Sequence, residues 1–286
     1  MSASDCLVLY FGYRMTSSQR FVRLLLEKKM EQIRLFSDEI QDSRPPQTLM
    51  WNLWHGCTRV SPGCAHCYMF RKDEAVGRDS TIVKKTSSFN LPVRKLRTGE
   101  YKGYYKVPSG SHFFTCFSSD FFHKDADSWR QDAWDMIRTR SDCTFFMITK
   151  RPERIGDNLP DDWNDGWKHV TIAVTCENQQ MADERLPVYL SLPLVSRAVM
   201  AEPLLEELHL EKYLSRIQNV SVGGESGPLA RPCDYDWVLS LKEQCNRFGV
   251  SFYYHQTGAK LIKDGREYTI PRSYQHSQAH KAGLDT

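Results

Sequence analysis

The stretch His169–Pro203, "HVTIAVTCENQQMADERLPVYLSLPLVSRAVMAEP", contains two apolar runs separated by a helical pattern. The first run, "HVTIAVTC", and the last, "SRAVMAEP", are short and rich in apolar and β-branched residues, as is typical of buried strands. The segment Gln179–Leu192 between them has the length and spacing of a helix. The order strand, helix, strand predicts two parallel strands joined by a crossover helix.

The same alternation of strand and helix patterns extends from Thr48 to the end of the chain. Five further runs have the composition of buried strands: "TLMWNLW", "HFFTCFSS", "CTFFMITK", "NVSVGGES" and "VSFYYHQT". Helical patterns lie between most of the runs, at Ser128–Arg140, Leu205–Arg216 and Tyr235–Phe248. Six or seven strand–helix repeats predict an α/β fold, a partial TIM-like (βα)6-7 barrel formed by residues 48–286.

Residues 1–47 are predicted to form an N-terminal helical extension and linker. Apolar residues between Val22 and Ile40 recur at helical spacing, with charged residues between them. The sequence "DSRPPQ", Asp42–Gln47, ends this pattern and is typical of a linker. We expect the extension to be a helix that docks on the main domain.

The composition is that of a soluble globular protein. Of the 286 residues, 41% are hydrophobic and 26% are charged, and the net charge is +3, so any basic binding surface must be local. No apolar run approaches 18 residues and no secretory signal is visible, which predicts a cytoplasmic protein without membrane contact. In a reducing cytoplasm, clustered cysteines bind metal or react rather than form disulfides.

A cluster of three cysteines follows the first predicted strand. The sequence "WHGCTRVSPGCAHCYMF", Trp54–Phe70, contains Cys57, Cys64 and Cys67 in the spacing C-x6-C-x2-C. Ser61, Pro62 and Gly63 favour a turn that brings the thiols together. This pattern predicts a metal site. Trp51, Trp54, Tyr68 and Phe70 flank it and are expected to shield a cluster and to stack on an adenine ring.

The residues alone are consistent with three kinds of site. The first is a zinc site whose fourth ligand is His55, His66 or Cys116, and the second is a redox dithiol. The third is an iron–sulfur cluster. Three cysteines leave one iron of such a cluster free for an outside molecule, whereas clusters that only transfer electrons usually have four protein ligands.

Polar residues stand at the C-terminal ends of the predicted strands. They are Ser118, Ser119, Asp120, Thr149, Lys150, Arg151, Thr175, Glu177, Glu202, Glu225, Ser226, His255 and Gln256. The carboxyl ends of parallel strands meet at one edge of a barrel or sheet, where ligand sites form. We therefore expect these side chains to converge beside the cysteine cluster.

A three-cysteine loop after the first strand of a partial barrel resembles the plan of the radical S-adenosylmethionine enzymes. Their usual spacing is C-x3-C-x2-C, and the first gap is longer here. The resemblance implies a [4Fe–4S] cluster on Cys57, Cys64 and Cys67. It also implies S-adenosylmethionine as a second cofactor, an external electron donor, and reductive cleavage to a 5′-deoxyadenosyl radical.

A closer resemblance covers Met50 to Gly258. The motifs "WNLWHGCTRVSPGCAHCY", "SSDFFHKD", "FFMITKRPERI", "VTCENQQMADERLP", "AEPLL" and "GGESGPLARPCDYDWVLSLKEQCNRFGVSFYYHQTG" carry it. They are similar to the three-cysteine phage and mobile-element family known as phage protein gp thirty-seven/sixty-eight, a divergent radical S-adenosylmethionine-like family near the spore photoproduct lyase group. That family usually ends its last strand with Lys-Gln-Trp-Gly, where this chain has His255, Gln256, Thr257 and Gly258.

The cofactor-binding candidates follow from this plan. Asp120, with Ser118 and Ser119, matches the position that binds the amino group of the methionine moiety. Lys150 and Arg151 are expected to pair with its carboxylate or with a substrate phosphate. Glu177, Glu202 and Glu225 are expected to bind ribose hydroxyls, the amino group or the substrate.

The segment Lys84–Lys106 is a candidate nucleic-acid contact. Its lysines and arginines alternate with Tyr101, Tyr104 and Tyr105, and Glu100 is its one acid. Cations with stacking rings suit nucleic-acid backbones and unstacked bases. The predicted substrate is therefore a nucleic acid or a nucleotide. The alternative is a zinc- or cluster-bearing nucleic-acid-binding module without catalysis.

Overall fold

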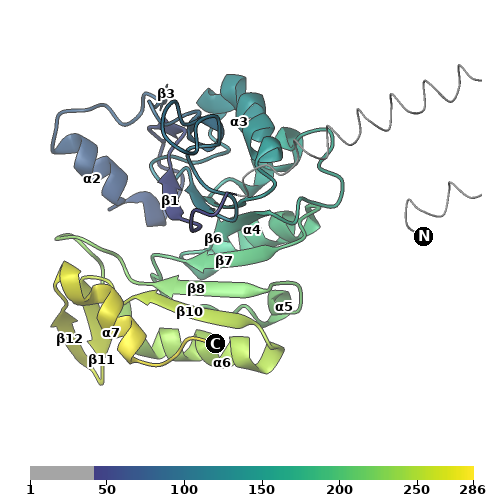
Figure 1. Ribbon diagram of the computed structural model, residues 1–286. Helices are drawn as coiled ribbons and strands as arrows, with labels where there is room; N and C mark the ends of the chain where they lie inside the picture. Colours follow the sequence, from purple (N-terminus) through teal and green to yellow (C-terminus); the bar gives the residue numbers. More distant parts are fainter. Residues whose placement is uncertain (1–41) are drawn as a thin grey trace, which may run out of the picture. The chain divides into compact units, whose positions relative to one another are not determined.

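The computed structural model describes residues 42–286 (Figure 1). Within them, Pro45–Thr286 forms one compact unit. The predicted N-terminal helix lies outside the described residues. No helix in residues 42–286 is long and apolar enough to cross a membrane.

A seven-stranded parallel sheet forms the centre of the molecule (Figure 1). Its strands are β1 (Thr48–Trp51), β4 (His112–Thr115), β5 (Thr144–Thr149), β6 (Val170–Thr175), β7 (Arg197–Ala201), β8 (Asn219–Gly223) and β10 (Ser251–Gln256). Their order in the sheet is their order along the chain, so every connection advances in the same direction. The sheet curls into a half-barrel, which confirms the predicted mixed α/β fold, and each of the seven predicted strand runs contains one of its strands.

Three long helices accompany the sheet: α3 (Asp127–Thr139), α4 (Gln179–Ser191) and α6 (Tyr235–Phe248). The Asn178 side chain caps α4 by accepting a hydrogen bond from Met181 N, and the Asp234 side chain caps α6 in the same way through Asp236 N. The α6 helix ends at Gly249, which has a left-handed conformation.

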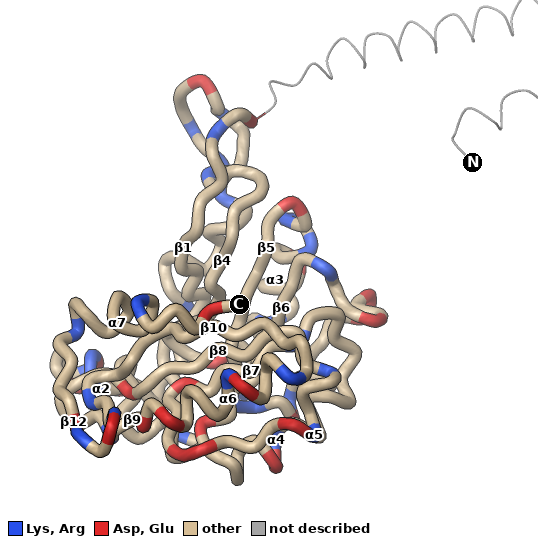
Figure 2. The backbone as a smooth tube through the Cα atoms, turned by 90° about the horizontal axis from the view of Figure 1, so that it is seen from below, with Lys and Arg blue, Asp and Glu red and all other residues tan. Residues whose placement is uncertain are grey.

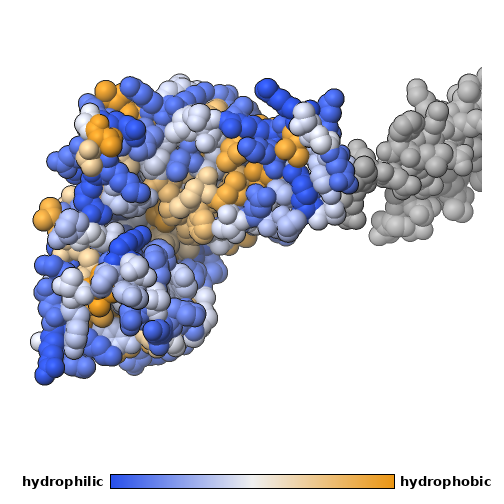
Figure 3. Space-filling view, turned by 60° about the vertical axis from the view of Figure 1, so that its left-hand side comes forward, coloured by the Kyte–Doolittle hydropathy of each residue, from blue (hydrophilic) through white to orange (hydrophobic). Residues whose placement is uncertain are grey.

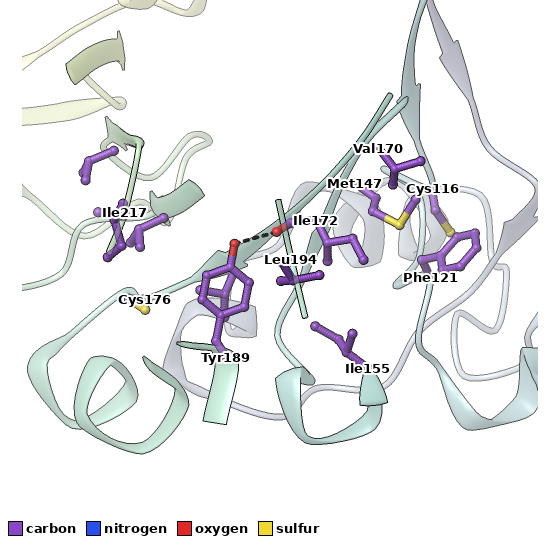
Figure 4. Packing of buried hydrophobic residues seen from close by; sticks show 14 of the residues in the cluster. Cys116, Phe121, Met147, Ile155, Val170, Ile172, Cys176, Tyr189, Leu194 and Ile217 are labelled. Carbon is purple, nitrogen blue, oxygen red and sulfur yellow. Dashed lines mark hydrogen bonds between the residues drawn. The ribbon is translucent and has the colours of Figure 1, made fainter. Parts of the chain in front are cut away.

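The main hydrophobic core lies between these helices and one face of the sheet. Figure 4 shows Met147, Ile172 and Leu194 packed in this layer, with the Tyr189 hydroxyl donating a hydrogen bond to Ile172 O at 2.6 Å. This bond satisfies the polar end of a fully buried tyrosine. Because these strands are buried by helices on this face and partly covered on the other, their sequences are almost continuously apolar.

The opposite face of the sheet carries a smaller apolar cluster. Ala173, Ala198 and Met200 are buried there, with Phe146 and Ile148 packed against them. The left-hand side of Figure 1 comes forward in Figure 3, which shows hydrophobic residues in the hollow between the upper and lower parts of the molecule. The half-barrel therefore has an apolar inner surface.

Smaller elements lie around the sheet. They are β2 (Trp54–His55), β3 (Lys84–Lys85), α2 (Tyr68–Glu74), α5 (Glu211–Leu214), β9 (Cys233–Asp234), β11 (Lys260–Lys263), β12 (Arg266–Thr269) and α7 (Gln275–Lys281). Short 3-10 turns are η1 (Pro62–Cys64), η2 (Leu91–Val93), η3 (Lys124–Ala126), η4 (Pro152–Arg154), η5 (Gly156–Asn158) and η6 (Arg272–Tyr274). The C-terminal residues cover the edge of β10, since Tyr254 N donates to Asp285 Oδ1 at 2.8 Å and Thr286 N donates to Phe252 O at 2.9 Å.

The predicted helix at Leu205–Arg216 is wrong for most of its length. Only Glu211–Leu214 is helical, and the residues before it form an irregular segment. Side chains of neighbouring helices form hydrogen bonds with the backbone of this segment: Gln179 Oε1 accepts from His209 N, and Gln244 Oε1 accepts from Leu210 N. Leu208 and Leu210 are fully buried. The apolar spacing therefore reflects burial of a non-helical segment.

Candidate functional site

The three cysteines lie on one loop at the carboxyl ends of the strands. Cys57 follows β2, Cys64 ends η1, and Cys67 immediately precedes α2. All three are free thiols; Cys64 is buried, and the other two are half-buried. We call the segment Trp54–Cys67 the cysteine loop.

Residues after β4 hold the start of the cysteine loop. Ser118 Oγ donates to Trp54 O at 3.2 Å, and Ser119 Oγ donates to Gly56 O. Gly56 N in turn donates to Ser118 O at 3.3 Å. These two serines therefore position backbone of the loop itself.

Asp120 and Arg151 form a buried ion pair beside Cys57. Their N–O distance is 2.8 Å, and their side chains are 5% and 8% exposed. Thr149 Oγ1 donates to Asp120 Oδ1 at 2.8 Å, and Arg151 Nη2 donates to Thr58 O at 2.9 Å. Both terminal nitrogens of Arg151 lie 3.8 Å from Cys57 Sγ. The pair thus joins the ends of β4 and β5 to the cysteine loop and places a cation against a thiol.

The environment of Cys57 opposes its ionisation in the absence of a metal. Burial raises the pKa of the thiol to about 11, although the Arg151 charge lowers it, and the charges of Asp120 and Cys64 add to the rise. A metal ligand must be a thiolate, so binding a metal here would release a proton. Arg151 is then placed to offset the negative charge that appears on the sulfur.

Glu177, at the end of β6, holds the middle of the cysteine loop. Its Oε1 accepts from Gly63 N at 3.0 Å, and its Oε2 accepts from Arg185 Nη1 at 2.7 Å. Burial alone raises the pKa of Glu177, but the charges of Arg185 and Lys150 lower it below its ordinary value. Glu177 is therefore ionised at neutral pH and binds the loop as a carboxylate.

Glu225, in the loop after β8, makes the fourth attachment. Its two oxygens accept from Arg231 Nη2 at 2.6 Å and Arg231 Nε at 3.0 Å. The same Nη2 donates to Pro62 O at 3.0 Å. A bidentate pair of this kind fixes the arginine geometrically as well as electrostatically.

Most of the residues predicted to bind a cofactor thus attach the cysteine loop to the half-barrel. Ser118, Ser119, Asp120, Arg151, Glu177 and Glu225 all have partners in the chain that serve this attachment. Sequence reasoning missed Arg185. An arginine between the buried residues Ala182 and Leu186 of α4 is the signal that could have found it, because a buried charge requires a partner.

Lys150 and Glu202 are the two candidates that do not bind the loop directly. Lys150 Nζ lies 3.5 Å from Thr175 Oγ1. Glu202 Oε1 accepts from Ser221 Oγ at 2.6 Å, and its Oε2 lies 2.7 Å from His255 Nδ1. Burial lowers the pKa of His255, but the hydrogen bond and charge of Glu202 outweigh it and raise the pKa above its ordinary value. The structure thus joins Glu202 to a histidine at the place where the resembled family usually has lysine.

The donor set of the cysteine loop fits an iron–sulfur cluster in its chemistry. Three thiols on one loop match the thiolate ligands that such clusters take, and each would bind a different iron. Among residues 42–286, no group of three or more histidine, cysteine, aspartate or glutamate side chains is arranged around a single metal ion. Of the candidate fourth ligands, His55 Nε2 lies 2.7 Å from Asp73 Oδ2, and Cys116 is buried.

For the two flanking tryptophans, the predicted stacking on an adenine ring is wrong. Trp51 and Trp54 are fully buried, and Trp51 packs edge-on against Phe113 and Phe145 of the core. A ring with no exposed face has no surface on which an adenine can stack. Phe70, from the same set, is covered by the guanidinium of Arg59, whose Cζ lies 4.0 Å from the ring centroid.

The basic segment Lys84–Lys106 is only partly beside the cysteine loop. Lys84 and Lys85 form β3, which pairs with β2, and they border a cavity of about 500 Å³ together with His55 and Arg78. The residues after Lys106 lead to the opposite end of the sheet, where Gly110 N donates to Asp142 O just before β5. Figure 2 shows Lys and Arg interspersed with Asp and Glu along the chain. Within this segment, Lys84 and Lys85 are the basic residues that border the cavity, whose lining also includes one acid, Asp79.

Fold and site together define an α/β half-barrel protein with a cysteine loop attached across the carboxyl ends of its parallel strands. The chain belongs to the DUF5131 family, described as "Protein of unknown function", whose model matches residues 47–283. No curated protein and no solved structure matches the chain.

Proposed function

We propose that this protein is an iron–sulfur enzyme of the radical S-adenosylmethionine type. The observation that supports the proposal is the attachment of one three-cysteine loop to the ends of β4, β5, β6 and β8 by Ser119, Arg151, Glu177 and Arg231. A loop that only packed against the surface would not require three buried or half-buried carboxylate–arginine pairs. The arrangement favours a site whose ligands must be held in fixed positions.

The residues of the chain have distinct parts in this proposal. Cys57, Cys64 and Cys67 hold the metal, and Arg151 compensates the thiolate charge at Cys57. A bound [4Fe–4S] cluster would supply reductive cleavage of S-adenosylmethionine to a 5′-deoxyadenosyl radical, with one electron from an external donor. The inner face of the half-barrel, with Phe146, Ile148 and Met200, would give a bound cofactor apolar surroundings.

The proposed substrate is a nucleotide or a nucleic acid. Its support is the cavity beside the cysteine loop, whose lining includes Arg78, Lys84 and Lys85. Two lysines and an arginine near one another favour phosphate groups. This position would place a phosphate of the substrate next to the loop.

Iron content and product formation test the proposal. Protein purified without oxygen should be brown, contain about four irons per chain, and form 5′-deoxyadenosine when it is reduced in the presence of S-adenosylmethionine. Cys64→Ala should abolish both colour and product. Cys245→Ala is the matched control, because Cys245 is a buried cysteine on α6, away from the loop, and this variant should keep its iron. A colourless protein with one zinc per chain and no product would refute the proposal.

A non-catalytic nucleic-acid-binding module is the second candidate, favoured by the same basic cavity. It predicts tight, salt-dependent binding of single-stranded DNA or RNA that Lys84→Gln with Lys85→Gln weakens. It also predicts no 5′-deoxyadenosine under any reducing condition. The two candidates therefore differ in product formation and not in nucleic-acid binding.

A further inference from the structure

Within residues 42–286, Arg71 is a cation without a partner at the mouth of the half-barrel. It lies on α2, four residues after Cys67, and its backbone N donates to Cys67 O at 3.2 Å. Residues four apart share one side of a helix, so Arg71 extends from the side on which the cysteine loop enters. Figures 1 and 2 both place α2 on the same side of the molecule as β12.

The guanidinium of Arg71 lies directly against the loop after β8. A Cβ added to Gly227 would be 1.6 Å from Arg71 Nη1 and 2.3 Å from its Cζ. Gly227 also has φ +108°, in the region that favours glycine. Glycine is therefore required at residue 227 for Arg71 to occupy this position.

No described side chain neutralises Arg71. Within residues 42–286 its guanidinium has no ion pair or hydrogen bond, and its Nε is buried and unsatisfied. The three arginines that attach the cysteine loop to the strand ends are each paired with a carboxylate: Arg151 with Asp120, Arg185 with Glu177, and Arg231 with Glu225. Arg71 has no such pair among the described residues.

The nearest loop carboxylate is not available to Arg71. Glu225 stands two residues before Gly227, but its Oε1 and Oε2 are occupied by the side chain of Arg231, and Oε2 also accepts from Arg231 N at 2.9 Å. A half-buried guanidinium without hydrogen bonds carries a desolvation cost that a bound anion would remove. Its planar N–H groups match the two oxygens of a carboxylate or phosphate.

We propose that Arg71, packed against Gly227, forms a binding site for an oxyanion, a carboxylate or a phosphate, carried by a ligand at the mouth of the half-barrel. The inference does not depend on the proposed radical chemistry, because Arg71 has no partner within residues 42–286 whatever the cysteines bind. The negative charge of the ligand would give Arg71 an anionic partner, as Asp120, Glu177 and Glu225 do for the other three arginines.

The test is calorimetric titration of the full chain, purified without oxygen, with two probes. Inorganic pyrophosphate represents a phosphate source and S-adenosylmethionine a carboxylate source. At least one should bind, and Arg71→Gln should weaken that binding by about tenfold or more, as expected for loss of a charged hydrogen bond. Arg71→Lys should weaken it less. The probe that responds identifies the source of the oxyanion.

Two further variants keep the test decisive. Arg59→Gln is the matched control, because Arg59 is an exposed arginine of the neighbouring cysteine loop that stacks on Phe70, and its removal should leave binding within about twofold. Gly227→Ala should weaken binding while Arg71 is retained, because the added Cβ displaces the guanidinium. Equal binding by Arg71→Gln and the unchanged chain, or no binding of either probe by the unchanged chain, would overturn the inference. Iron content, measured in the same samples, reports separately on the proposed function.

Discussion

Three carboxylates, after β4, β6 and β8, each bind an arginine, and this pairing explains how one loop is held over a parallel sheet. Asp120, Glu177 and Glu225 are nearly or fully buried, so each requires a cation nearby. The arginine, or the carboxylate itself, then reaches the backbone of the cysteine loop. Charge-assisted bonds of this type are short and directional, which favours fixed positions for the loop.

Asp120→Asn should destabilise the protein markedly. The change leaves Arg151 buried next to Cys57 without its counter-charge, and breaking a buried ion pair at one partner costs about 3 kcal/mol or more. The free energy of unfolding, measured with urea, should fall by that amount. Asp132→Asn is the control, because Asp132 is 62% exposed and lies 3.5 Å from Lys85. It should change the free energy by about 0.5 kcal/mol or less, and equal effects of the two variants would contradict the role assigned to Asp120.

His255 should titrate above its ordinary range, because Glu202 favours its charged form. In an NMR titration, its midpoint should lie above 6.5 and should fall in Glu202→Gln. The raised pKa means that the pair stabilises the fold fully below the pKa of the unfolded chain. That contribution is lost as the pH rises through the folded pKa. A midpoint that Glu202→Gln leaves unchanged would show that the 2.7 Å contact is not the cause.

At the scale of elements, the sequence was sufficient to predict the seven strands of the central sheet, because each strand lies in a short apolar run with polar residues at its end. The helices at Ser128–Arg140, Gln179–Leu192 and Tyr235–Phe248 were also predicted within a residue at each end. Leu205–Arg216 was not, because its backbone bonds go to Gln179 and Gln244, which are far away in sequence. The hairpin β11–β12 was missed, since the four residues of β12 are all exposed and lack an apolar pattern.

The candidate site was predictable in its location but not in its pairings. Strand ends identified Asp120, Glu177 and Glu225 as neighbours of the cysteines, because parallel strands end at one edge. Which arginine each would bind depends on side-chain reach across elements, as with Arg185 eight residues after Glu177. That Arg71 has no partner among residues 42–286 could be recognised only from the structure, because it depends on where the side chains of other elements lie.

Gly249→Ala should destabilise α6 through its C-terminal cap. Gly249 has φ +67°, and a Cβ added there would meet nothing within 4 Å, so the cost is purely conformational. An L-residue in the left-handed region costs about 1 kcal/mol, and the urea midpoint should fall accordingly. Gly156→Ala is the control, because Gly156 lies outside the left-handed region and its added Cβ would make an ordinary contact with Leu192 at 3.5 Å. An equal loss in both variants would rule out the cap as the cause.

At the scale of the whole molecule, the half-barrel is covered at its β10 edge and open on its inner face. The C-terminal residues occupy the free edge of β10 through Asp285 and Thr286. The inner face instead keeps a hollow with apolar residues on its surface (Figure 3). A sheet protected at its edge and unfilled inside is the arrangement expected of a ligand-binding barrel.

Residues 45–286 should fold without the preceding segment. All seven strands of the central sheet, the three long helices and the main core belong to Pro45–Thr286, which forms one compact unit. A chain that begins at Pro45 should therefore keep the cooperative urea transition of the full chain. Its extrapolated free energy of unfolding should agree within about 15%, the usual uncertainty of the extrapolation. A chain that begins at Leu53 is the control: it lacks β1, exposes the edge of β4 and removes Trp51 from the core, so it should unfold at lower urea or aggregate. Loss of the cooperative transition in the chain that begins at Pro45 would show that the half-barrel depends on residues before it.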